Sequence, residues 1–143
     1  MKRAPDHYSS LAMLGVLSLQ RNRPEIALRY AELSISIEAR VANAHVTRGD
    51  ALHRLERYDE AVDAYQSAHA LNPDAYDALT NCGITFARLG RHDEALRCYD
   101  LALEKCPSSV DTRYNRGIEL QRRGRDAEAL ADFDAVLRQS EAT

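Results

Sequence analysis

The chain has 143 residues, 45% of them hydrophobic and 29% charged, which is the size and composition of one ordinary globular domain and not of a disordered chain. Nineteen basic and 22 acidic side chains give a net charge of −3, too weak and too mixed to indicate a nucleic acid or a membrane surface as the partner. Only four prolines and six glycines, with no tryptophan, favour helix. We therefore expect an all-α protein.

The N-terminal segment resembles a secretory signal only superficially. Lys2 and Arg3 precede an apolar stretch at 11–19, but Pro5 and polar residues intervene and no small-x-small cleavage site follows. The sequence holds no run of 18 apolar residues, the length that a membrane span requires. The three cysteines are odd in number and lack a C-x-x-C spacing: Cys82, Cys98 and Cys106. We predict a cytoplasmic protein without membrane contact.

Several residue types recur every 34 residues along the chain. This period is carried first by glycine, at Gly15, Gly49, Gly83 and Gly117, and next by alanine, at Ala27, Ala61, Ala95 and Ala129. A bulky ring follows at Tyr65, Tyr99 and Phe133, with Ala31 in the first unit. A proline closes the second and third units, at Pro73 and Pro107, with Ala39 in the first. Glycine and alanine allow two antiparallel helices to approach closely, so each unit predicts a helix pair.

Acidic residues and prolines mark the ends of these helices. Acidic residues cluster in the first turn of each second helix from the second unit on, as at Asp59 and Asp93, where they favour the positive end of the helix dipole. The segment 89–93 between the helices of the third unit predicts a turn that includes His92. Pro73 and Pro107 should end their helices, since proline removes a donor and restrains its predecessor.

This pattern resembles the tetratricopeptide repeat, a helix–turn–helix unit with glycine, alanine, an aromatic and proline at fixed positions. The resemblance implies a right-handed α-solenoid of four units and about eight helices, with a lead-in at 1–7. It implies one domain over 8–143, divided into units 8–41, 42–75, 76–109 and 110–143. Units three and four also resemble the repeat arrays of O-linked N-acetylglucosamine transferases.

In proteins of this kind, one stripe on the first helix of each unit faces the second helix. A different stripe on that first helix lines a groove that holds a peptide or a partner helix. In the first unit these positions are Ser9, Ala12, Met13, Val16, Leu19 and Gln20. In the later units the candidate binding residues are Asn43, Thr47, Asp50, Arg54, Asp77, Asn81, Ile84, Arg88, Asp111, Tyr114, Asn115, Ile118 and Arg122. The second unit also contributes Val46 and His53.

Two series in the groove suggest how a ligand is held. Arg54, Arg88 and Arg122 could clamp carboxylates bidentately. Thr47, Asn81 and Asn115 could bond a peptide backbone, because an amide offers both a donor and an acceptor. The alternative is that the arginines are solvated or pair with the groove aspartates.

The sequence offers no convergent catalytic group. Cys82, beside Gly83, is best interpreted as a small core residue, and His92 as a solvated turn residue. His45 and His53 have no third ligand at metal spacing. No phosphate-binding glycine motif occurs. We therefore expect a protein that is not an enzyme and needs no cofactor or metal.

Three functions remain open at this point. The favoured one is a protein–protein interaction scaffold that binds a peptide or a partner segment in the groove. The second is the substrate-recognition segment of a larger bacterial glycosyltransferase, and the third, RNA binding, is disfavoured by the groove aspartates. At the C-terminal end no further helix covers Leu130, Phe133 and Leu137. We therefore expect either that the sequence is a segment of a longer array or that this end self-associates.

Overall fold

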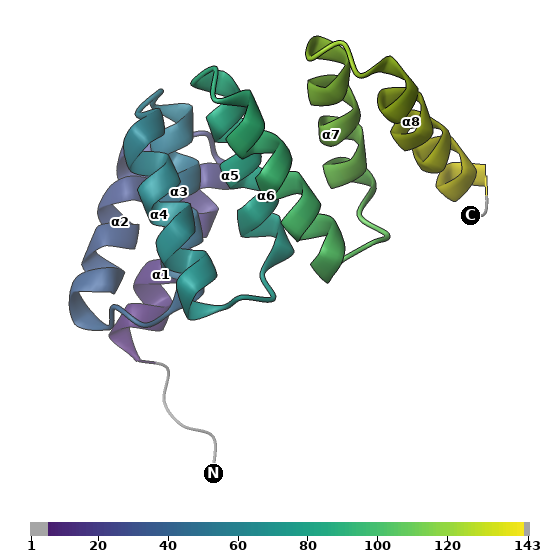
Figure 1. Ribbon diagram of the computed structural model, residues 1–143. Helices are drawn as coiled ribbons and strands as arrows, with labels where there is room; N and C mark the ends of the chain where they lie inside the picture. The colour runs from purple at the N-terminus through teal and green to yellow at the C-terminus, as the bar shows by residue number, and fades with distance from the viewer. Residues whose placement is uncertain (1–5, 142–143) are drawn as a thin grey trace. The chain divides into compact units, whose positions relative to one another are not determined.

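The computed structural model describes residues 6–141, in which every regular element is an α-helix. The helices are α1 (His7–Gln20), α2 (Pro24–Ile37), α3 (Ala42–Arg54), α4 (Tyr58–Leu71), α5 (Tyr76–Arg88), α6 (His92–Lys105), α7 (Val110–Arg122) and α8 (Asp126–Glu141). Consecutive helices pack in pairs, α1 with α2 through to α7 with α8 (Figure 1). The predicted all-α architecture of helix–turn–helix units is confirmed.

The helices group into two compact units, Met1–Pro73 with α1 to α4 and Asp74–Thr143 with α5 to α8. We call them the first and the second compact unit and describe each by itself. Helices α3, α5 and α7 begin at Ala42, Tyr76 and Val110, the first residues of the predicted second, third and fourth repeats. The single domain over 8–143 and the right-handed winding stay predictions.

The predicted lead-in at 1–7 falls mainly on residues 1–5, which lie outside the described residues, as does Thr143. The part that is described belongs to the first helix. Asp6 is the N-cap of α1, and its carboxylate accepts a hydrogen bond from the Ser9 amide at 2.9 Å. His7 is the first residue of α1, so the helix starts one residue earlier than the predicted repeat.

The prolines end the second helices as predicted. α4 ends at Leu71, two residues before Pro73, and α6 ends at Lys105, two residues before Pro107. The turns inside the four repeats share a residue with a positive φ, and these residues are 34 apart. They are Asn22 (56°), Glu56 (60°), Gly90 (75°) and Gly124 (75°). The left-handed backbone is thus built with glycine only in the second compact unit.

The repeating glycines lie against the repeating rings. A Cβ placed on Gly49 would lie 2.6 Å from Cε1 of Tyr65, and one on Gly83 would lie 2.6 Å from Cε1 of Tyr99. Both tyrosines are 2% exposed. In the first repeat, where Ala31 replaces the ring, the neighbour of Gly15 is the methyl group of Thr47 at 3.1 Å. The predicted close approach of paired helices is confirmed.

Among the described residues, no helix is both long and apolar enough to cross a membrane.

Candidate functional site

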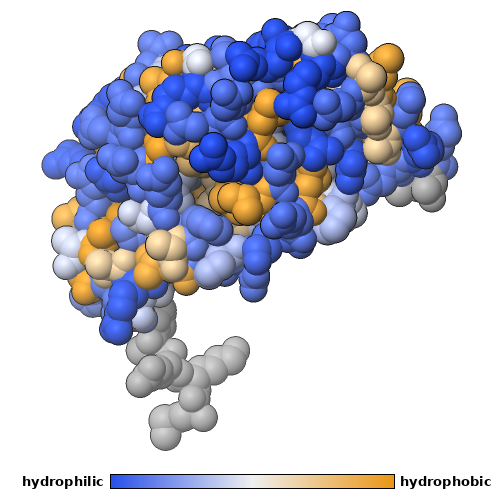
Figure 2. Space-filling model, viewed as in Figure 1, coloured by the Kyte–Doolittle hydropathy of each residue, from blue (hydrophilic) through white to orange (hydrophobic). Residues whose placement is uncertain are grey.

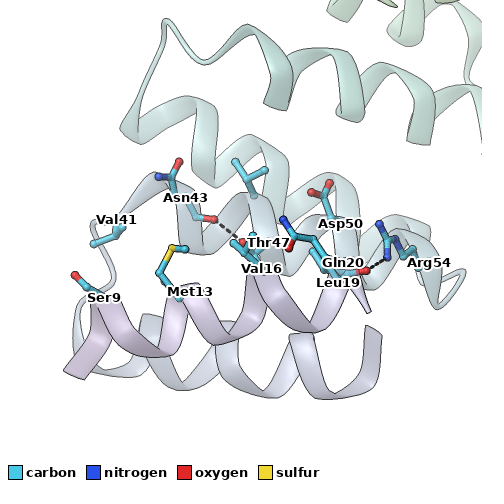
Figure 3. Close-up of a pocket in the computed structure, with 12 residues that line it drawn as sticks. Ser9, Met13, Val16, Leu19, Gln20, Val41, Asn43, Thr47, Asp50 and Arg54 are labelled. Atoms are coloured by element: carbon cyan, nitrogen blue, oxygen red, sulfur yellow. Dashed lines mark hydrogen bonds between the residues drawn. The ribbon is translucent and has the colours of Figure 1, made fainter. Parts of the chain in front are cut away.

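The first compact unit holds a pocket of about 480 Å³ between α1 and α3. Its lining includes all the predicted groove positions of the first two repeats except His53, with Val41 added (Figure 3). They are Ser9, Ala12, Met13, Val16, Leu19, Gln20, Asn43, Val46, Thr47, Asp50 and Arg54. His53 instead packs edge-on against the ring of Tyr58, with the two ring centres 5.1 Å apart. The stripe predicted on each first helix therefore forms one continuous surface here.

Apolar side chains from two helices form the base of this pocket. α1 contributes Ala12, Met13 and Val16, and α3 contributes Val46. Met13 is 58% exposed although its side chain is apolar and flexible. An exposed methionine in a concave apolar site is suited to packing against a ligand, because its thioether chain adapts to different shapes.

The charged residues of this pocket are already engaged within the protein. The Tyr65 hydroxyl donates a short hydrogen bond to the Asp50 carboxylate. Arg54 donates to the backbone oxygen of Leu19 at 2.5 Å, and this carbonyl belongs to the last turn of α1 (Figure 3). This carbonyl also accepts from the backbone amide of Asn22 at 2.9 Å, so Arg54 is its second donor. The pocket presents an apolar base with one negative and one positive side chain in its wall.

Thr47 was expected to bond the backbone of a bound peptide, but its hydroxyl bonds within the protein instead. Thr47 is 4% exposed, and its hydroxyl donates to the backbone oxygen of Asn43 at 3.0 Å. Its methyl group packs toward Gly15. Thr47 therefore shapes the pocket wall, while Asn43 is exposed and offers its amide to a ligand.

The second compact unit brings its predicted groove residues into two neighbouring pockets that share Ile84 and Asn115. One, of about 410 Å³, adds Arg88, Ile118 and Arg122 from the predicted set. The other, of about 340 Å³, adds Asp77, Asn81, Asp111 and Tyr114. All nine predicted positions of repeats three and four thus line one of these two pockets.

The two predicted groove arginines of the second compact unit, Arg88 and Arg122, differ in their contacts. Arg122 lies 3.6 Å from the buried carboxylate of Glu119, within its own helix turn. The structure of residues 6–141 gives the exposed Arg88 no hydrogen bond or ion pair. The Asn115 amide donates to the backbone oxygen of Asp111 at 2.8 Å, which leaves its carbonyl oxygen for another donor. Of the predicted arginine series, Arg88 is the most available to bind an anion.

One contact in this region overturns a sequence expectation. His92 was expected to be a solvated turn residue, but it is the first residue of α6 and its Nδ1 atom makes a short contact with Glu119. Glu119 is 1% exposed and lies in the wall of the larger pocket. The two residues are 27 apart and belong to different repeats, so nothing in a single repeat could have indicated the pair.

A second set of polar contacts missed from the sequence centres on Arg116 of repeat four. Arg116 donates to both carboxylate oxygens of Asp132, at 2.8 and 2.7 Å, and to Asp100 at 3.0 Å. Asp132 is 2% exposed. These bonds raise the pKa of Arg116, with the Asp132 bond the largest cause. In repeat three the equivalent positions hold two cysteines.

Those cysteines are Cys82, 3% exposed, and its neighbour Cys98. Their mutual hydrogen bond is the largest cause that raises the pKa of the Cys82 thiol, and burial raises it further. Both thiols are free. The interpretation of Cys82 as a small core residue is confirmed. Within residues 6–141, no group of three or more His, Cys, Asp or Glu side chains is placed to hold a metal ion.

Comparison with known families identifies the repeat. A tetratricopeptide repeat model matches residues 12–75 and again 46–110. The chain belongs to the tetratricopeptide repeat family. This agrees with the paired helices and with the glycine–ring contacts described above. The resemblance to O-linked N-acetylglucosamine transferase arrays is a finer statement than the family match and stays a prediction.

Solved structures with the same fold include several of MamA. A crystal structure of MamA has a TM-score of 0.90 at 25% identity, covering 96% of this chain and 81% of that one. A second crystal structure of MamA has a TM-score of 0.86 at 24% identity, covering 94% and 74%. The MamA RS-1 ArsTM double mutant reaches 0.87 at 14% identity, covering 95% and 76%. The last two likenesses concern the fold alone. No curated protein matches the chain.

Proposed function

We propose that this tetratricopeptide repeat protein is an interaction scaffold that binds a peptide or a segment of a partner protein. The observation that carries the proposal is the pocket of the first compact unit, where apolar residues of α1 and α3 form a concave base. Asp50 and Arg54 in its wall each have a partner within the protein. A ligand that fits such a site is an uncharged, apolar stretch of polypeptide.

The second compact unit would add polar recognition. Arg88 is exposed and lines a pocket with the amide of Asn115. A guanidinium group and an amide together suit a carboxylate and a peptide backbone. Asp77 and Asp111 in the adjoining pocket disfavour a polyanion such as RNA, because they would repel its phosphates.

The scaffold function requires no catalysis by this chain, and we infer that it is not an enzyme. Free thiols at Cys82, Cys98 and Cys106 suit the reducing cytoplasm, where we expect the protein to act. The alternative, recognition of substrates for a glycosyltransferase, uses the same groove but needs a catalytic region outside these 143 residues.

Affinity capture from cell extract tests the proposal, with the retained proteins identified by mass spectrometry. The decisive variant is Met13→Glu, which places a charge at the apolar base on an exposed position. The matched control is Leu71→Glu in α4, which is 40% exposed and outside the pocket lining. Partners of the groove should be retained by the wild type and the control and lost with Met13→Glu.

A peptide from a captured partner then gives a direct measurement. Its affinity by calorimetry should fall at least about 10-fold in Met13→Glu, since burying an unpaired charge costs more than 1.4 kcal/mol. Equal retention and equal affinity in all three proteins would show that the groove is not the binding site. Circular dichroism should give the same helix content for the three proteins.

A further inference from the structure

Two leucines of α8 are exposed at repeat positions that are buried in α6. Leu130 and Leu137 are 62% and 59% exposed. Leu96 and Leu103, which lie 34 residues earlier, are each 7% exposed. Figure 2 shows hydrophobic side chains among hydrophilic ones at the right of the view, where Figure 1 draws α8. The outer side of α8 thus presents an apolar surface of the kind that α6 buries.

α7 covers this side of α6, and its contacts show what a covering helix provides. Arg116 donates to the Asp100 carboxylate at 3.0 Å. The carboxylate of Glu119, three residues later in α7, makes a short contact with the His92 ring. A helix that packs on this side of α6 therefore brings charged side chains that match the polar groups beneath them.

The equivalent side of α8 carries only acidic charges between its leucines. Its residues are spaced by 4, 4, 3 and 4, so they lie along one face of the helix. They are all exposed, and we call them the α8 stripe: Asp126, Leu130, Asp134, Leu137 and Glu141. Asp126 has the repeat position of His92, and Asp134 has that of Asp100. A helix placed on α8 as α7 is placed on α6 would meet a carboxylate at both charged contacts.

These contacts define the chemistry of the helix that fits the α8 stripe. The residue of α7 that follows Glu119 is Leu120, which is 4% exposed and lines one pocket together with Leu96. The equivalent of Leu96 in α8 is Leu130. The matching helix therefore carries two basic residues three apart, with an apolar residue directly after the second. Opposite charges arranged in this way favour one pairing and one direction.

A second copy of this chain does not supply such a helix. The residues at the two charged positions of its first helices are Leu14 and Leu17, Arg48 and Ala51, Cys82 and Thr85, and Arg116 and Glu119. No pair among them is basic at both positions. Stacking of α1 on the α8 stripe would place two carboxylates against leucines, and burying such unpaired charges is costly.

We propose that the α8 stripe binds a basic amphipathic helix of a partner protein, which packs on α8 as α7 packs on α6. Leu130 and Leu137 form the apolar centre of the contact, while Asp134 and Asp126 pair with the two basic residues. Residues of the stripe are absent from the linings of the three groove pockets. The site is therefore separate from the groove and adds a second binding surface to the proposed scaffold.

Binding of a synthetic helix to the full chain tests the proposal. The probe is the 110–122 segment with Glu119→Arg, which gives it two basic residues at the required spacing. A staple between positions 114 and 118, which face the groove pockets in the chain, keeps this short peptide helical. Fluorescence anisotropy of the labelled probe measures its affinity. The same peptide with Glu119 retained should bind at least about 10-fold more weakly, because its carboxylate would face Asp126.

A substitution at the centre of the stripe locates the contact. Leu130→Glu should weaken binding of the probe at least about 10-fold, since it places a charge in the apolar centre. The matched control is Leu101→Glu in α6, where the leucine is 38% exposed and lies outside the stripe. The control should bind the probe like the wild type. Circular dichroism should give the same helix content for all three proteins.

A charge exchange and a sedimentation measurement separate the alternatives. Asp134→Arg should weaken binding of the probe, and a probe that also carries Arg116→Asp should bind this variant more tightly than it binds the wild type. Sedimentation of the chain alone tests the other occupant, since self-association that is lost in Leu130→Glu would assign the stripe to a second copy. That result, the absence of probe binding, or binding that Leu130→Glu leaves unchanged would overturn the proposal.

Discussion

The contact between repeats one and two and the contact between repeats three and four differ in chemistry at one repeat position. In the first compact unit, where α3 packs on α2, this position holds Ala51, which is fully buried. In the second, where α7 packs on α6, it holds Glu119, which is 1% exposed and contacts His92 of α6. Glu119 has the repeat position that Ala51 holds in repeat two. One backbone arrangement thus accommodates an apolar or a polar contact.

The difference matters because polar contacts depend on their partners. A buried alanine needs only space, whereas a buried carboxylate needs donors and becomes costly when one is lost. In repeat four, Asp132 depends on Arg116, while the equivalent residues of repeat two are Ala64 and Arg48. We therefore expect single substitutions to be tolerated worse in the second compact unit than in the first.

Loss of the Asp132 carboxylate should have the largest effect. Asp132→Ala removes both hydrogen bonds to Arg116 and leaves a partly buried guanidinium with Asp100 alone. We expect the free energy of unfolding to fall by about 3 kcal/mol, the lower end for a broken buried pair, since Arg116 keeps some solvent contact. Urea unfolding followed by circular dichroism measures this change.

Two further variants test whether the loss comes from the unpaired charge. Asp132→Ala combined with Arg116→Leu should cost less than Asp132→Ala alone, because no charge is then left without its partner. Glu128→Ala, which removes an exposed partner of Arg125, should leave the unfolding midpoint unchanged. If the double variant is less stable than the single one, the pair contributes packing and not charge compensation.

The His92–Glu119 contact gives the next effect. His92→Ala removes the ring from the 1% exposed Glu119, which then keeps Arg122 at 3.6 Å. We expect a loss of about 2 kcal/mol, the typical cost of depriving a buried charged group of its hydrogen bond. Hydrogen exchange of the α7 amides should accelerate in parallel, because α6 and α7 meet there.

A variant that removes both partners of this contact provides the control. The double variant His92→Ala/Glu119→Ala places alanine where Ala51 stands in repeat two. It should be more stable than His92→Ala alone. The opposite order would mean that Glu119 is stabilised mainly by other groups than His92.

A smaller contrast is expected between equivalent glycines. Gly83→Ala would bring a Cβ to 2.6 Å from the buried Tyr99 ring, so the ring or a helix must move, at a cost of about 1 to 2 kcal/mol. A Cβ in Gly15→Ala would have the Thr47 methyl group at 3.1 Å as its nearest neighbour, since Ala31 stands where other repeats have a ring. The gain in helix propensity of up to about 1 kcal/mol should then make it neutral. Thermal unfolding of both variants measures the contrast.

The sequence predicted the features that follow from the repeat itself. The 34-residue register placed the helix pairs, the glycine–ring contacts and the helix ends at Pro73 and Pro107. It also placed the groove positions on one stripe, and the structure gathers almost all of them into pockets. These features are local or periodic, so spacing alone contains them.

Contacts that individual side chains make across repeats were not predictable in this way. Arg54 was expected in a ligand clamp, but its acceptor is the backbone oxygen of Leu19, which has no signature in the sequence. The environment of His92 depends on Glu119 in the next repeat, where the other repeats have uncharged residues. Such contacts require the packing of neighbouring helices to be known.

Substitutions in the turns should change the free energy of unfolding least, and one of them should stabilise the protein. Glu56 has a φ of 60°, a left-handed conformation that costs a residue with a Cβ about 1 to 2 kcal/mol, whereas the equivalent Gly90 adopts it freely. Glu56→Gly should therefore stabilise the protein by about 0.5 to 1 kcal/mol, after the greater chain entropy of glycine in the unfolded state is subtracted. Gly90→Ala should destabilise it by a similar amount, although no atom lies within 4 Å of its added Cβ. Urea midpoints that move in these opposite directions would show that backbone conformation, and not contact, distinguishes the turns of the two compact units.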